Sequence, residues 1–97
     1  MAGYLIANLD IHDAAAYDEY RQKVGAVIAQ YGGRFIVRGG AIEPVEGNVP
    51  WKRVVVLAFP TFEAARRFYH SKEYAPLIAQ RAGAAKSDIV LVEGYDG

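Results

Sequence analysis

The sequence predicts a single α+β domain whose elements follow in the order strand, helix, strand, strand, helix, strand. Two observations lead to this prediction. Stretches with apolar residues at helical spacing alternate with short runs of β-branched and aromatic residues. The chain has 97 residues, and a domain takes roughly 100–200. We therefore expect residues 1–97 to form one domain.

The first strand is expected at residues 4–11, where alternate apolar residues share one face: Leu5, Ala7, Leu9 and Ile11. Asp13 is suited to the N-cap of the helix that follows. The apolar stripe of this helix consists of Tyr17, Tyr20, Val24, Val27, Ile28 and Tyr31. The Gly32-Gly33 pair predicts its end, because glycine adopts the left-handed conformation that closes a helix.

The second strand is expected at residues 34–38, with Arg34 and Arg38 on the same face. Gly39-Gly40 predicts a break or bulge there. Residues 41–46 could continue the strand as a bent edge, because proline at position 44 suits an edge. Residues 52–59 form the third predicted strand, which is apolar on both faces.

The second helix is expected after Pro60, with Thr61 as its N-cap. Its apolar stripe consists of Phe62, Ala65, Phe68 and Tyr69. Ser71 is suited to capping a further short helix, and Pro76 to the first turn of that helix. The last strand is expected at residues 87–93, again with apolar residues on both faces.

This order of elements is the ferredoxin-like βαββαβ pattern with an antiparallel sheet. Its helices can cover only one face of the sheet. The third and fourth strands nevertheless carry apolar residues on the other face, which on a soluble protein indicates an interface. We therefore expect a homodimer in which two sheets pack face to face, a dimeric α+β barrel.

Charge and composition argue against several classes of partner. The 11 basic and 11 acidic residues balance, whereas proteins that bind nucleic acid usually show a basic excess. The chain has no cysteine, so disulfides and thiolate metal sites are excluded. No apolar run approaches the ~20 residues that cross a bilayer, and no signal peptide is recognised. We expect a cytoplasmic protein with no membrane partner.

A family resemblance rests on several segments. They are YDEY at 17–20, YGGRFIVRGG at 31–40, Glu46-Gly47, FPTFEAA at 59–65, YHSKEY at 69–74, Arg81 and the closing Val92-Glu93-Gly94. With them the chain resembles the small bacterial domain-of-unknown-function 1330 (DUF1330) family, in the dimeric α+β barrel superfamily. The resemblance implies a ferredoxin-like protomer that dimerises through its sheet. It implies no reaction.

The wider superfamily includes cofactor-free monooxygenases, lactone isomerases and haem-degrading enzymes. The haem enzymes place a ligating histidine after an aromatic-serine-aromatic run. The similar run at 68–74 is followed by residues 75–79 without a histidine, so we expect no haem and no other cofactor. Asp10, His12 and Asp13 are interpreted as a strand end and an N-cap rather than a metal site, which needs three or four convergent ligands.

The candidate site residues are polar or aromatic side chains on the predicted strands and helices. Arg81 is expected on a helix side that faces the body of the protein, whereas the sheet face that carries Asn8 and Arg38 is left open. His70 is the candidate general base. Candidate ligand-binding residues are Asn8, Tyr20, Arg38, Tyr69, Tyr74 and Arg81. For each of them a structural role, such as packing or pairing with a neighbour, stays open. A guanidinium such as that of Arg81 suits a carboxylate ligand.

Three hypotheses follow for function. The first is a homodimer that binds a small apolar or aromatic carboxylate or carbonyl compound. The second is a cofactor-independent enzyme, similar to a monooxygenase or isomerase, with His70 as the base. The third is a purely structural dimer module. A pocket of about 300 Å³ or more between helices and sheet would favour the first two, whereas a filled interior would exclude both.

Overall fold

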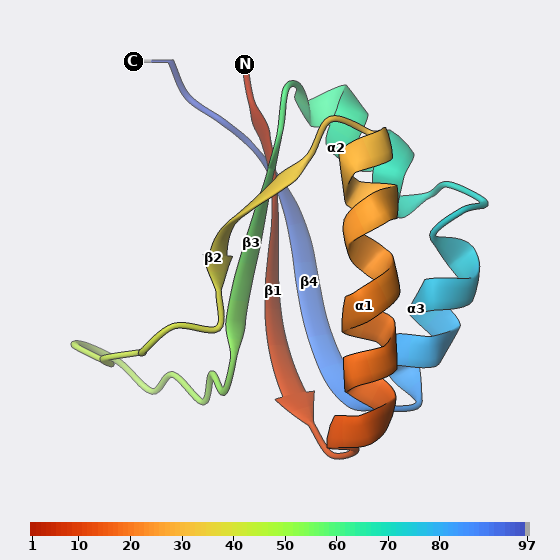
Figure 1. Ribbon diagram of the computed structural model, residues 1–97. Coiled ribbons are helices and arrows are strands. Elements are labelled where there is room, and N and C mark those ends of the chain that lie inside the picture. The colour runs from red at the N-terminus through yellow and green to blue at the C-terminus, as the bar shows by residue number, and fades with distance from the viewer. Residues whose placement is uncertain (97) are drawn as a thin grey trace.

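The computed structural model describes residues 1–96 of the chain. Its elements are β1 (Gly3–Ile11), α1 (Ala14–Gln30), β2 (Arg34–Arg38), β3 (Val54–Phe59), α2 (Phe62–Tyr69), α3 (Ala75–Ala82) and β4 (Ala85–Glu93). This order confirms the predicted βαββαβ pattern, with α3 as the short extra helix before the last strand. The domain has two layers, a sheet and a layer of helices (Figure 1).

The sheet is antiparallel, with the strand order β2-β3-β1-β4. Leu5 in β1 lies opposite Leu57 in β3 and Leu91 in β4, so these side chains share one face. All three helices lie on that side of the sheet (Figure 1). Between the layers is a core that includes Val24 and Ile28 of α1. We call the covered side the helix face and the other side the open face.

The helix caps predicted at Asp13 and Thr61 are confirmed. The Asp13 carboxylate accepts a hydrogen bond from the Ala16 amide at 3.1 Å, and the Thr61 hydroxyl accepts one from the Ala64 amide at 3.0 Å. These bonds satisfy amides that the first helical turns leave unpaired. The cap predicted at Ser71 is wrong, because the N-cap of α3 is Tyr74; the Ser71 hydroxyl accepts instead from the Tyr74 amide in the turn before the helix. Within residues 1–96, no helix has the length and apolarity needed to cross a bilayer.

Strand β2 differs from its prediction. A bulge lies between Phe35 and Val37, so Arg34 lies opposite Ala58 on the open face, whereas Arg38 lies opposite Val55 on the helix face. The expectation that the two arginines share a face is therefore wrong, because one extra residue reverses the alternation of side chains. The expected continuation at 41–46 is also wrong, since the strand ends at Arg38.

The open face is apolar, as the alternation in β3 and β4 predicts. Ile6 lies opposite Val56 and Val90 at its centre, and Val90 is 56% exposed. The connection 39–53 projects on the side away from the helices (Figure 1). It adds further exposed apolar side chains, namely Ile42, Val45, Val49 and Trp51. The protomer therefore leaves a large apolar surface uncovered.

Two glycines give opposite expectations for substitution by alanine. A Cβ at Gly3 would lie 2.5 Å from the Phe62 Cα and 2.7 Å from the Thr61 carbonyl oxygen. Because backbone atoms cannot move aside without distorting β1 or α2, Gly3→Ala should lower the free energy of unfolding by about 1–3 kcal/mol.

A Cβ at Gly25, within α1, would meet no atom within 4 Å. Gly25→Ala should therefore raise stability by about 0.5–1 kcal/mol. Urea unfolding measures both, and a neutral Gly3→Ala would contradict the close approach of β1 to α2.

Candidate functional site

A narrow cavity lies between α1 and the helix face of the sheet. Its volume is about 30 Å³, enough for one or two water molecules. The apolar part of its wall consists of Leu5, Ala7, Leu9, Val24, Ile28, Phe35, Val55, Leu57 and Ile89. The polar part consists of Tyr17, Tyr20, Tyr74, Arg21, Arg38, Arg53 and Arg81. This inner cavity alone falls well short of the pocket of about 300 Å³ that would favour a ligand.

Two tyrosines and an arginine form a hydrogen-bonded group at the inner cavity. The hydroxyls of Tyr20 and Tyr74 lie 2.8 Å apart. Arg81 donates from Nη1 to the Tyr74 hydroxyl and from Nε to the Ser87 hydroxyl, the latter at 3.2 Å. Only 5% of Arg81 is exposed. The group joins α1, the turn before α3, α3 and β4, so each side chain holds its neighbours in place.

No carboxylate from residues 1–96 lines the inner cavity. Within residues 1–96 the ion pairs are Arg21–Asp18, Arg66–Glu63 and Arg67–Glu63, so neither Arg53 nor Arg81 has an acidic partner there. Arg81 is buried and Arg53 is half-buried, whereas Arg38 is exposed and lies over the Phe35 ring at 4.4 Å. The cavity therefore holds positive charge that no protein anion neutralises.

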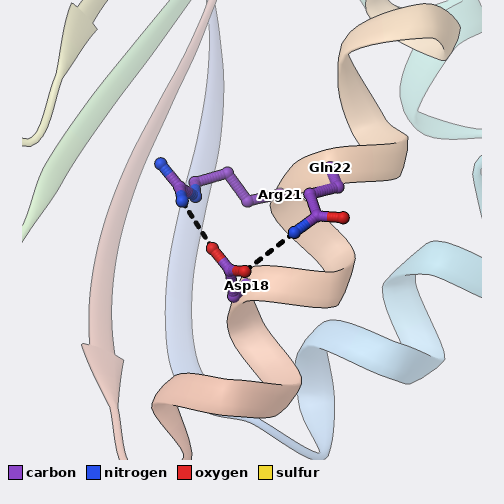
Figure 2. Close-up of polar contacts among 3 residues, drawn as sticks. All are labelled: Asp18, Arg21 and Gln22. Atoms are coloured by element: carbon purple, nitrogen blue, oxygen red, sulfur yellow. Dashed lines mark hydrogen bonds and ion pairs between the residues drawn. The ribbon is translucent and has the colours of Figure 1, made fainter.

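A second hollow of about 160 Å³ adjoins the cavity near the start of α1. The two share Tyr17, Arg21 and Arg53 as lining residues. Figure 2 shows the Arg21 side chain reaching from α1 toward the sheet, with its guanidinium bonded to Asp18. Gln22 donates a second hydrogen bond to that carboxylate at 2.8 Å. These hydrogen bonds from Arg21 and Gln22 lower the pKa of Asp18. At the border of the two spaces, Arg21 is thus held in an ion pair, whereas Arg53 has no acidic partner within residues 1–96.

The tyrosine pair predicts a loss of stability at alkaline pH. Burial raises the pKa of both Tyr20 and Tyr74. A tyrosine that ionises near pH ~10 when unfolded but higher when folded stabilises the fold fully below that pH. That stabilisation is lost as the pH rises further.

Urea unfolding between pH 8 and 11 should therefore show the free energy of unfolding falling above about pH 10. The fall should be shallower in Tyr20→Phe, whereas Tyr95→Phe, at an exposed position, should keep the wild-type slope. Equal slopes in all three proteins would contradict a role for the buried phenols.

The structure brings together four of the predicted site residues: Tyr20, Arg38, Tyr74 and Arg81 all line the inner cavity. Tyr69 packs edge-on against Tyr74, at 5.8 Å between ring centres, but does not line the cavity.

Asn8 and His70 lie elsewhere. Asn8 is on the open face, beside a hollow of about 200 Å³, and accepts a hydrogen bond from the Lys52 amide at 2.9 Å. His70 is exposed at the C-terminal end of α2. Its ring contacts Tyr69 edge-on at 5.4 Å. The roles predicted for Asn8 and His70 stay predictions.

Sequence reasoning missed two polar residues at the site, Arg53 and Ser87. The signal for both was the alternation of side chains between the two faces of a strand. Arg53 lies two and four residues before Val55 and Leu57, which face the helices, and Ser87 lies two and four residues before Ile89 and Leu91. Residues two apart in a strand share a face. The same alternation that gave the core could therefore have placed them.

The sequence matches a known protein family along almost its whole length. A family model described as "Domain of unknown function (DUF1330)" matches residues 2–95. The chain belongs to this family. No curated protein matches the sequence of this DUF1330 protein. The match confirms the resemblance carried by the double-glycine segment and the aromatic helices.

Solved structures share the fold of this DUF1330 protein at low sequence identity. A protein of unknown function from Rhodopseudomonas palustris is 16% identical, with a TM-score of 0.73, over 99% of this chain and 84% of its own. SnoaB, a cofactor-independent oxygenase from Streptomyces nogalater, is 14% identical, with a TM-score of 0.65, over 99% and 95%. A dimeric ferredoxin-like protein of unknown function from Bacteroides fragilis is 15% identical, with a TM-score of 0.64, over 96% of both chains. These likenesses establish the ferredoxin-like fold.

Proposed function

We propose that this DUF1330 protein is a homodimer that binds a small carboxylic acid with an apolar or aromatic body at the inner cavity. The observation that supports this best is Arg81, a residue 5% exposed whose guanidinium has only hydroxyl groups as hydrogen-bond partners within residues 1–96. A buried charge is costly unless it is paired with an opposite charge. An acid would supply the missing negative charge.

The surroundings of Arg81 fit the rest of such a ligand. A guanidinium binds a carboxylate through charge-assisted hydrogen bonds, often two in parallel. The remaining wall is mainly aliphatic and aromatic, which suits a hydrocarbon body. Pockets of this composition, apolar with a few polar groups that fix orientation, are typical of small-molecule sites.

Binding requires the cavity to widen, because its present volume of about 30 Å³ cannot hold an aromatic acid. The outer hollow of about 160 Å³ is the natural entry, since Tyr17, Arg21 and Arg53 border both spaces. The Arg21 and Asp18 side chains at this entry are exposed, so they can move at low cost. In this proposal the acid enters from the outer hollow and displaces side chains along α1.

The open face supports the homodimer. Val90 and Val92 of β4 and Ile36 of β2 are exposed apolar residues on that face. Packing two such sheets about 10 Å apart would bury them. The Bacteroides fragilis protein of the same fold is described as dimeric. A second copy is therefore the partner that this surface suits best.

A thermal-shift experiment tests ligand binding. Benzoate, phenylacetate and cinnamate are titrated against the wild-type protein, with their neutral amides as controls. An acid present at 100 times its Kd should add about 2.7 kcal/mol of stability, which appears as a rise in Tm. The amides should give little or no rise, because they lack the charge that Arg81 requires.

Arg81→Met removes the guanidinium and keeps much of its volume. We expect this variant to fold, with an unchanged far-UV circular dichroism spectrum, and to lose the rise in Tm given by the acids. An unchanged rise would assign Arg81 a structural role. If the wild type responds to none of the acids, a purely structural dimer module becomes the better description. His70 is exposed and outside the cavity, so no observation favours a second, catalytic function.

A further inference from the structure

Arg53 occupies the place where the inner cavity meets the outer hollow. It lines both spaces, and its guanidinium lies over the Tyr17 ring, 5.8 Å from the ring centre. Its Nε is buried and has no hydrogen-bond partner within residues 1–96. A buried N–H without a partner is rare and costly. Such a donor, on a cation without an acidic partner, indicates that a group normally supplied from outside the chain belongs there.

The guanidinium of Arg53 occupies the space that a side chain at position 39 would fill, and we call this space its seat. A Cβ at position 39 would lie 2.3 Å from Nη1 of Arg53 and 2.4 Å from its Cζ. The backbone of Gly39 also has a φ of +70°, a value that residues other than glycine rarely adopt. The Gly39 amide is bonded to the Val54 carbonyl at 2.8 Å, which fixes the seat to β3. Any larger residue at position 39 would push the guanidinium away.

We infer that Arg53, seated on Gly39, is a second anion-binding residue and contacts the ligand's carboxylate at the junction of the two spaces. This inference rests on the proposed function and adds a residue to it. A ligand that reaches the inner cavity through the outer hollow must pass Arg53. Its unpartnered Nε and terminal nitrogens can then form the fork that a carboxylate fits.

The test is calorimetric titration with phenylacetate and, as the uncharged counterpart, phenylacetamide. Arg53→Gln should weaken phenylacetate binding at least about tenfold, the loss expected for a hydrogen bond to a charged group. Phenylacetamide should bind both the wild type and Arg53→Gln weakly or not at all, since it makes no ionic contact. Lys52→Gln is the matched control, because it removes one positive charge from an exposed neighbouring side chain that lines neither space. It should leave both affinities unchanged.

Gly39→Ala provides a second variant that keeps the charge of Arg53 but fills its seat. It should reproduce the loss for phenylacetate, whereas an unaltered affinity in both Arg53→Gln and Gly39→Ala would overturn the inference. Arg81→Met separates the two proposals. If phenylacetate binding depends on Arg81 and not on Arg53, only the role of Arg53 fails. If the wild type does not bind phenylacetate, both proposals fail together.

Discussion

Phe68→Ala is expected to lower the free energy of unfolding by about 3–5 kcal/mol, the range for removing a buried aromatic ring. Phe68 has 0% exposure and stands at the centre of an aromatic cluster. Its ring centre lies 4.3 Å from that of Tyr74, 5.2 Å from that of Phe59 and 6.2 Å from that of Tyr31. Because α2 packs on the sheet through this ring, its loss would leave a cavity that the neighbouring rings cannot fill.

Phe68→Ala should also loosen the candidate site, since the Phe68 ring packs against Tyr74, whose hydroxyl accepts a hydrogen bond from Arg81. Urea unfolding at one fixed protein concentration measures the effect, because the stability of a dimer depends on concentration. Tyr95→Ala is the control: Tyr95 is 92% exposed, so stability should change by less than about 0.5 kcal/mol. A loss below about 1 kcal/mol in Phe68→Ala would mean that the aromatic cluster is not the core of the domain.

The fold was predictable because its signals are local. The apolar stripe from Tyr17 to Tyr31, the cap at Asp13 and the apolar run at 54–59 each depend on a few neighbouring residues. The bulge in β2 was not predictable in position. It lies between Phe35 and Val37, with no glycine to mark it. The break predicted at Gly39-Gly40 is confirmed, since β2 ends at Arg38.

The site was only partly predictable. Tyr20 and Arg81 lie on helical faces directed toward the sheet, so their meeting followed from the pattern. Tyr74 lies in the turn before α3, outside any helical stripe. Asn8 and Arg38 depended on which face of the sheet each strand residue occupies. That assignment needed the register between strands, and for Arg38 it needed the bulge. The absence of an acidic partner for Arg81 is a long-range property that no local pattern contains.

Val90→Asp is expected to convert the proposed dimer into a monomer. Val90 lies on the open face midway along the edge strand β4, opposite Ile6 in β1, and at 56% exposed it is the most exposed valine of the four strands. In a face-to-face dimer the new carboxylate would be buried among apolar side chains without a partner, at a cost of several kcal/mol. Size-exclusion chromatography with light scattering should then give the protomer mass of 10.6 kDa.

Ala26→Asp supplies the comparison for this change. Ala26 is exposed on α1, in the helix layer, so this variant should keep the mass of the wild type. Far-UV circular dichroism should show that both variants remain folded. A Val90→Asp protein that keeps the mass of the wild-type dimer would place the interface on another surface of the protomer.

The mass of the wild-type protein in solution is the most direct test of the central claim, that the apolar open face is covered by a second copy. Light scattering at micromolar concentration should give twice the chain mass of 10.6 kDa. A mass of 10.6 kDa under those conditions would contradict the claim. The open face would then need a different partner, or none.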